Sequence, residues 1–118
     1  MKNKAYIFFF MLFTTTAFSA VAQSDSVAKA VLIITDTAIA KEKAVKQAIG
    51  IIDRAIKNPQ SEKSAYAWYV RGYVYKEYYK VLEASDHKST ARANAVIYLK
   101  TALGLDKNKE YDSDIRKS

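Results

Sequence analysis

Apolar residues recur at helical spacing along most of the chain after residue 24. Residues 31–34 are typical of a β-strand as well as of a helix. The polar residues 35–37 predict a break in the helix at that point, or the N-cap of a new helix. Over 24–40 four apolar side chains are spaced four, three and four, which predicts a helix: Val27, Val31, Ile34 and Ala38.

The segment 40–57 has the clearest amphipathic pattern. The pair Asn58-Pro59 ends it, because proline disfavours helix in the residue before it and cannot donate a backbone hydrogen bond. A helix there places cations and Asp53 on the side opposite its apolar stripe. That stripe consists of Ala44, Ala48, Ile52 and Ala55, with Val45, Ile49 and Ile56 beside it, and the opposite cations are Lys41, Lys43 and Lys46.

Two further helices are predicted, over 61–84 and 90–103, with a polar loop at 85–90. We expect Ser61 to be the N-cap of the first of these helices. Gly50 and Gly72 lie inside predicted helices, where close helix contact would offset their low helix propensity. The charged segment after residue 106 has no periodicity apart from Tyr111 and Ile115. It is interpreted as a frayed tail or as the start of a further helical unit.

The two helices carry an alternation of large and small residues. In antiparallel helices the small residues let the backbones approach and the large ones fill the gaps. The residues are Trp68, Gly72 and Tyr75 on the first helix, and Ala95, Leu99 and Ala102 on the second. This order resembles the tetratricopeptide repeat, whose signature is W-x2-L-G-x2-Y, then A-x3-F, with a later Pro.

The chain departs from that signature at two positions. Arg71 stands where Leu is usual, and Lys107 stands where Pro is usual. Arg71 either loosens the packing or lies across an adjacent helix with its charged head in water. The resemblance implies an all-α, antiparallel helix-turn-helix array of about one and a half to two repeats. It would form a domain over 23–107, followed by a polar tail over 108–118.

The first 22 residues have the three parts of a secretory signal peptide. Lys2 and Lys4 precede an apolar run at 5–13, and small residues at 20–22 precede a cleavage site. An uncleaved anchor is the alternative, but the run is short for a bilayer span. We therefore expect export to the periplasm or the outside of the cell, with no stable membrane span after cleavage. Cleavage would lower the formal net charge from +7 to +5.

Composition excludes several kinds of chemistry. The chain has no Cys, which excludes disulfides and thiolate sites. His87, the one histidine, lies in the predicted loop with one adjacent carboxylate, too few groups for a metal site. We find no catalytic motif and interpret Asp53, Glu77 and Glu83 as solvated surface charges. We therefore predict no enzyme activity, cofactor, metal or nucleic-acid partner.

The tyrosines give the sharpest hint of function. Six of them fall between residues 66 and 79, too many for one buried stripe. By resemblance, the ligand-binding side of the array would carry Tyr66, Tyr69, Tyr73, Lys76 and Glu77. Tyrosine with nearby cations suits a partner surface, because it offers a large contact area at low entropy cost. Alternatively, the rings fill a small core or cover the place of a missing repeat.

These observations predict an exported, non-enzymatic scaffold that docks a peptide or partner protein on its tyrosine-rich helix. The alternatives are a stand-alone structural helical bundle and a glycan-binding accessory protein, since exposed aromatic rings also stack on sugars. Repeat arrays of two units or fewer leave apolar flanks open. We therefore also expect a homo-oligomer or a complex with another protein.

Overall fold

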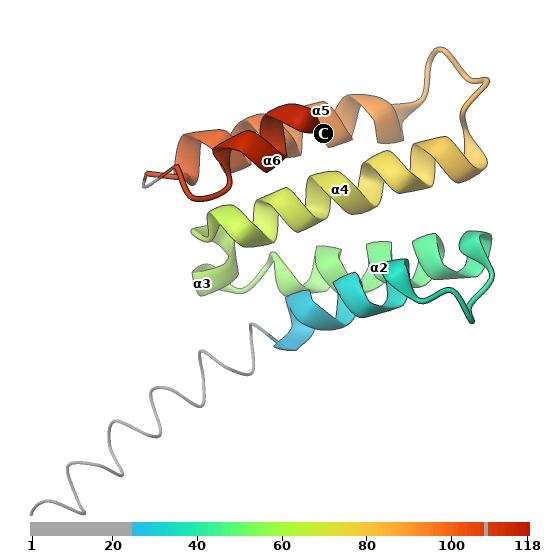
Figure 1. Ribbon diagram of the computed structural model, residues 1–118, viewed down its shortest axis with the longest axis horizontal. Coiled ribbons are helices and arrows are strands. Elements are labelled where there is room, and N and C mark those ends of the chain that lie inside the picture. The colour runs from blue at the N-terminus through green and yellow to red at the C-terminus, as the bar shows by residue number, and fades with distance from the viewer. Residues whose placement is uncertain (1–24, 108) are drawn as a thin grey trace, which may run out of the picture.

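The computed structural model describes residues 25–107 and 109–118, which fold into helices without a β-strand (Figure 1). The predicted all-α class is confirmed. Residues 1–22, the predicted signal peptide, lie outside the described residues. Residues 25–35 form the first described helix. It is followed by α2 (Lys41–Ala55), α3 (Pro59–Glu62), α4 (Ala65–Leu82), α5 (Thr90–Leu105) and α6 (Asp112–Lys117).

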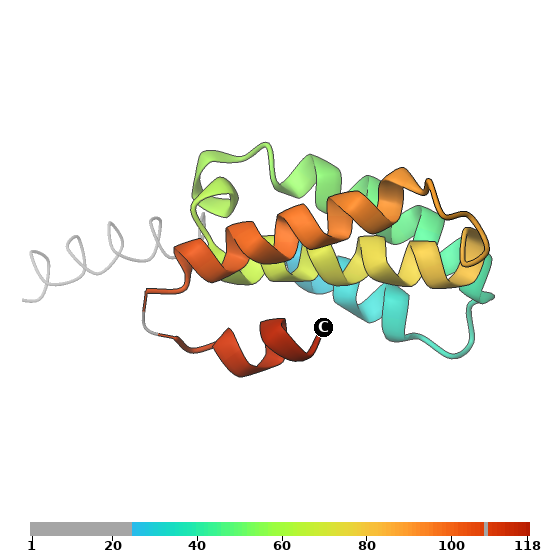
Figure 2. The same ribbon diagram turned by 90° about the horizontal axis from the view of Figure 1, so that it is seen from above.

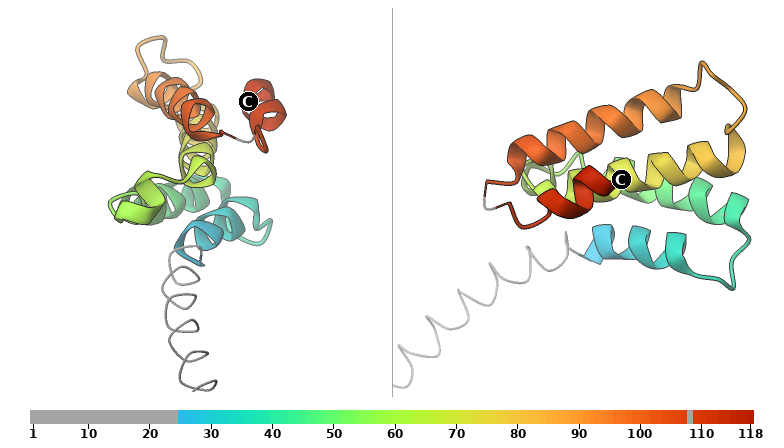
Figure 3. Two further views of the ribbon diagram at one scale, coloured as in Figure 1. Left: turned by 90° about the vertical axis from the view of Figure 1, so that its left-hand side faces the viewer. Right: turned by 45° about the horizontal axis from the view of Figure 1, so that its top comes forward.

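The long helices lie side by side in chain order. Helix 25–35 lies against α2, α4 lies between α2 and α5, and successive long helices run in opposite directions (Figures 1 and 2). The short helix α6 turns back along α5, to one side of the layer formed by the other helices (Figure 3). Because α4 contacts a long helix on each side, its side chains must pack against both α2 and α5.

The apolar stripe of α2 is buried as predicted. Its residues Ala44, Val45, Ala48, Ile52 and Ala55 are all buried, and the predicted outward cations of α2 are exposed. Burial of an aliphatic side chain contributes about 1.5–3 kcal/mol relative to exposure. The main core lies between helix 25–35, α2 and α4. It includes Val27, Ala30 and Ile34 from the first helix, Val45, Ala48 and Ile52 from α2, and Val70 and Val74 from α4.

The break predicted at 35–37 is present, but the residues in it do not cap α2. Helix 25–35 ends at Thr35, whose hydroxyl donates back to the carbonyl of Val31 at 2.7 Å. The Asp36 carboxylate accepts from the Ala38 amide at 2.8 Å and so shapes the turn. The residue that precedes α2 is Ala40, which has no side-chain cap.

The prediction that Ser61 is the N-cap of the helix expected over 61–84 is wrong. Ser61 is buried within the short helix α3, which has Pro59 in its first turn, where the missing amide hydrogen is least costly. The N-cap of α4 is Ser64, whose hydroxyl accepts from the Ala67 amide at 3.2 Å. The Trp68 indole donates to the Glu62 carbonyl at 2.7 Å and so links α3 to α4.

Helices α4 and α5 meet at a glycine, as the alternation of large and small residues predicted. A Cβ on Gly72 would lie 2.7 Å from both Cγ and Cδ2 of Leu99, and 3.2 Å from its backbone nitrogen. Ala95 and Ala102 are also buried on α5. The leucine side chain therefore occupies the space that glycine leaves open. Gly50 differs, because a Cβ added there would meet only the side chain of Arg54, at 3.7 Å, so the expected helix contact is absent.

The segment after Asp106 is not frayed. It forms α6, and Ile115 within it is only 3% exposed. The Asp106 carboxylate is buried and accepts from the amides of Glu110 and Tyr111, at 3.0 and 2.9 Å. Lys109 adopts a positive φ of 54°, which reverses the chain direction. These contacts turn the polar segment back onto the helical layer.

We predict that alanine substitutions at the two glycines change stability in opposite directions. Gly72→Ala should lower the free energy of unfolding by about 1–3 kcal/mol, because the added methyl group overpacks against Leu99. Gly50→Ala should raise it by up to about 1 kcal/mol through helix propensity, since its new methyl group meets only an ordinary contact. Urea unfolding of both variants measures the effect. Equal stability of Gly72→Ala and the wild type would contradict the helix contact.

Candidate functional site

The five residues predicted to bind a partner lie along one flank of α4, which we call the docking face. It consists of Tyr66, Tyr69, Tyr73, Lys76 and Glu77. Offsets of three and four residues place its tyrosines on the same side of the helix. The opposite flank of α4 carries Arg71 and Tyr75. The line of closest approach to α5, at Gly72, runs between these two flanks.

A tyrosine that immediately precedes α6 contacts the docking face. Tyr111, which precedes α6, stacks on Tyr69 with ring centroids 6.4 Å apart and planes 22° apart. Its ring centroid is 5.5 Å from that of Tyr66. Sequence reasoning missed this contact, although the four-residue spacing of Tyr111 and Ile115 was the signal that could have found it. The structure thus brings a third ring to two of the predicted site residues.

The other three residues of the docking face differ in their surroundings. Tyr73 packs against the main core, and the Lys76 ammonium lies 4.9 Å from the centre of its ring. Burial raises the pKa of the Tyr73 hydroxyl, and the nearby charges of Glu77 and Tyr69 add to the effect. Glu77 forms an ion pair with Lys80 at 3.6 Å and is mostly covered. Tyr73 therefore contributes to the core as well as to the flank.

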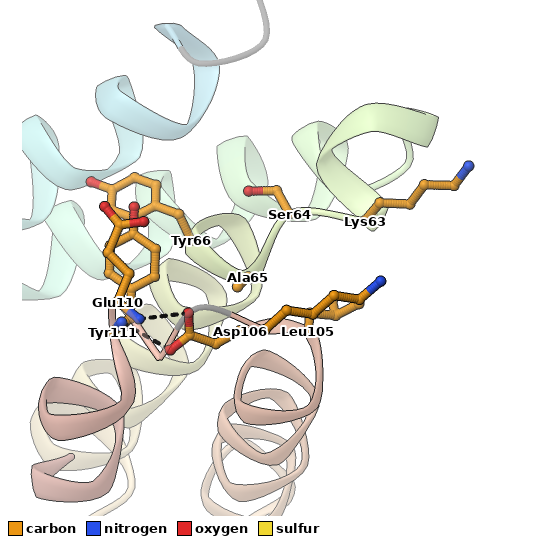
Figure 4. A pocket seen from close by; sticks show the side chains of 9 residues that line it. Lys63, Ser64, Ala65, Tyr66, Leu105, Asp106, Glu110 and Tyr111 are labelled. Carbon is orange, nitrogen blue, oxygen red and sulfur yellow. Dashed lines mark hydrogen bonds between the residues drawn. The ribbon is translucent and has the colours of Figure 1, made fainter.

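A pocket of about 480 Å³ adjoins the docking face at the start of α4 (Figure 4). The rings of Tyr66 and Tyr111 lie together on one side of it with the Glu110 side chain, whereas Lys63 points away. Burial raises the pKa of the Tyr111 hydroxyl, and the charge of Glu110 and the hydroxyl of Tyr66 add to this. The pocket is lined by Lys63, Ser64, Ala65, Tyr66, Leu105, Asp106, Lys107, Glu110 and Tyr111.

The opposite flank of α4 holds a polar cluster that joins three helices, which we call the arginine clamp: Asp53, Arg71, Tyr75 and Tyr98. The Arg71 Nε donates to Asp53 of α2 at 3.0 Å, and the Tyr75 hydroxyl donates to the other oxygen of the same carboxylate at 2.6 Å. The Arg71 guanidinium also lies 4.0 Å from the centre of the Tyr98 ring on α5. Tyr75 and Tyr98 meet edge to face at 5.0 Å.

The arginine clamp corrects two predictions. Asp53 is not a solvated surface charge, because both of its carboxylate oxygens have partners on α4. Arg71 does lie across neighbouring helices, but its head is not in water, since its side chain is only 16% exposed. The clamp also sets the chemistry of Tyr75. Burial raises the pKa of its hydroxyl, and the hydrogen bond to Asp53 raises it further.

Other candidate groups are dispersed. His87 is exposed in the loop between α4 and α5, and Glu83 accepts from the hydroxyl of Ser89, the N-cap of α5. Within residues 25–107 and 109–118, no three His, Cys, Asp or Glu side chains gather in a way that could hold a metal ion. None of the helices in the described part of the chain is long and apolar enough to span a bilayer.

No protein-family model, curated protein or solved structure matches the chain.

We predict that Tyr75→Phe lowers the free energy of unfolding by about 1–2 kcal/mol at neutral pH, because Asp53 loses a donor. The matched control is Tyr79→Phe, whose hydroxyl donates to the Ala84 carbonyl near the surface, and which should change stability less. Thermal or urea unfolding measures both.

The difference between wild type and Tyr75→Phe should also depend on pH. The pKa of Tyr75 is raised in the folded state, so its contribution is complete below the unfolded tyrosine pKa of about 10 and is lost as pH rises above that value. Unfolding measured across this range should therefore show the two stabilities converging at high pH. A difference that stays constant up to strongly alkaline pH would contradict the proposed role of the hydroxyl.

Proposed function

We propose that this protein is an exported, non-enzymatic scaffold of the tetratricopeptide type, which docks a helix or peptide of a partner protein on the docking face. The signal-peptide pattern at 1–22 supports export, and the arrangement of α4 against α5 is compatible with a repeat unit. Export would place the protein in the periplasm or outside the cell.

The observation that carries this proposal is the contact of Tyr111 with Tyr66 and Tyr69. These two rings are not members of the main core, and Tyr66 is 37% exposed. The chain's own C-terminal segment thus uses this flank of α4 to seat an aromatic side chain. A partner segment with a similar side chain would find the same kind of surface.

The chemistry of the flank favours a particular kind of partner. Its rings provide apolar area with few rotatable bonds, and aromatic anchors of this type often dominate binding energy. The Lys76 ammonium above Tyr73 and the carboxylate of Glu77 provide polar groups at the side of the rings. We expect a partner helix or peptide with one or two apolar anchors and a mixed polar border.

The test uses the full chain as bait in envelope extracts of the producing cells. Tyr66→Ser combined with Tyr69→Ser should reduce capture of a specific partner by at least about thirtyfold, because a single ring that acts as an anchor contributes about 2 kcal/mol or more. Tyr73 is left intact, since its contacts with the core would confuse binding with folding.

The matched control is Val96→Ser combined with Ile97→Ser, which removes exposed apolar area from α5 instead. This control should keep full capture, and thermal unfolding should show all variants folded. Equal capture by both double variants would refute docking at the tyrosines. A large loss of melting temperature in the tyrosine variant would instead assign those rings to core packing.

A further inference from the structure

A second surface, separate from the docking face, lies between helix 25–35 and α2. It is an open groove of about 430 Å³, which we call the basic groove. Its apolar floor includes Ile33 and Ile51, and its walls carry three cations and no carboxylate. The lining residues are Lys29, Ile33, Lys46, Gln47, Gly50, Ile51 and Arg54.

The three cations of the groove form no ion pair in the described part of the chain, although Asp25 and Glu42 lie one helical turn before Lys29 and Lys46. Neither Lys29, Lys46 nor Arg54 forms an ion pair or a side-chain hydrogen bond with any described residue. Asp53, the carboxylate adjacent in sequence to Arg54, is held by Arg71 and Tyr75 on α4. The positive charge of the groove is therefore available to an external anion.

Gly50 gives a second reason to regard this groove as a site. A glycine inside a helix costs about 1 kcal/mol relative to alanine. No neighbouring helix requires it, since only the Arg54 side chain comes within 4 Å of an added Cβ. The absence of a side chain at this position instead keeps the floor of the groove open. Packing thus leaves this glycine unexplained, whereas a ligand in the groove would explain it.

The surface around the groove extends its positive charge and adds an apolar side chain. A neighbouring shallow depression shares Lys46 and Gln47 with the groove and adds Lys43, with Glu42 as its one carboxylate. On the other wall, Leu32 follows Lys29 by three residues, so the two lie on the same side of the helix. Leu32 is 69% exposed, the most exposed large apolar side chain in the described residues.

We propose that the basic groove binds the phosphate headgroups of anionic lipids and holds this end of the protein on a membrane surface. Lys29, Lys46 and Arg54 contact the phosphates, and Leu32 enters the apolar boundary beneath them. Positive charge spread over a broad face suits a planar anionic surface. A protruding leucine beside cations suits the interface between headgroups and acyl chains. An acidic peptide paired with the cations would leave Leu32 in water, whereas a membrane interface buries that side chain.

The experiment measures partition of the full chain onto vesicles of phosphatidylcholine alone and of equal parts phosphatidylcholine and phosphatidylglycerol. The readout is the ratio of the two partition coefficients, so a contribution from the N-terminal apolar run that is common to all variants cancels. Lys29→Gln, Lys46→Gln and Arg54→Gln together should lower this ratio by about a hundredfold, since each cation near an anionic surface contributes about fivefold.

The matched control removes the same charge elsewhere, through Lys88→Gln, Lys100→Gln and Lys117→Gln. This variant should lose less than about fivefold of the ratio. Leu32→Ser should weaken partition about fivefold without changing its dependence on salt, because it removes only apolar contact. Gly50→Leu should reduce the ratio while all cations remain, because the new side chain occupies the floor.

Three outcomes would overturn the proposal. The first is an equal loss from both triple variants, which would indicate net charge alone. The second is binding to soluble polyglutamate without any preference for the anionic vesicles, which would indicate an acidic polypeptide. The third is full displacement from vesicles by millimolar inorganic phosphate at constant ionic strength, which would indicate a free anion. Thermal unfolding should show each variant folded, since the substituted side chains are exposed and Gly50 borders the open groove.

Discussion

The contact of Leu99 with the bare backbone of Gly72 is the constraint on which the rest of the structure depends. It sets how closely α5 approaches α4, and that distance places Tyr98 beside Arg71 and Tyr75. The same arginine then reaches Asp53 on α2. One glycine thus determines whether three helices can share a single polar cluster, and a wider separation would leave a partly buried guanidinium without its ring.

The two flanks of α4 are held by different kinds of interaction. The arginine clamp uses charge-assisted hydrogen bonds that fix its geometry. The docking face is covered at one end by ring contacts, each of which contributes about 0.5–1.5 kcal/mol. A helix as short as α6 is not stable alone, so these contacts and Ile115 must hold it in place. The docking face is therefore bordered by one of the least stable elements of the fold.

The sequence predicted best where one periodic pattern determines the structure. The stripe of α2 and the faces of α4 and α5 that carry Gly72 and Leu99 followed from spacing, because helix geometry decides which side chains of one helix share a face. The N-cap of α4 did not follow. Ser61 and Ser64 are both good caps, and Pro59 starts a separate short helix that moves the true boundary by three residues.

The polar features were harder to predict because they join residues distant in sequence. Asp53 looked solvated on its own helix, since nothing in the pattern of α2 shows that Arg71 and Tyr75 face it from α4. The role of Tyr111 depends on the chain reversal at Lys109, which no regular periodicity encodes. The site residues on α4 were placed on one flank by spacing, but the cover over Tyr69 required tertiary information.

The most direct test of this account is a nuclear Overhauser measurement between the methyl protons of Leu99 and the α-protons of Gly72. The structure predicts strong cross-peaks between them, because the leucine lies against the glycine backbone. Cross-peaks from the Leu99 methyl groups only to residues of its own helix would contradict the account, since α5 would then not contact α4 at this glycine.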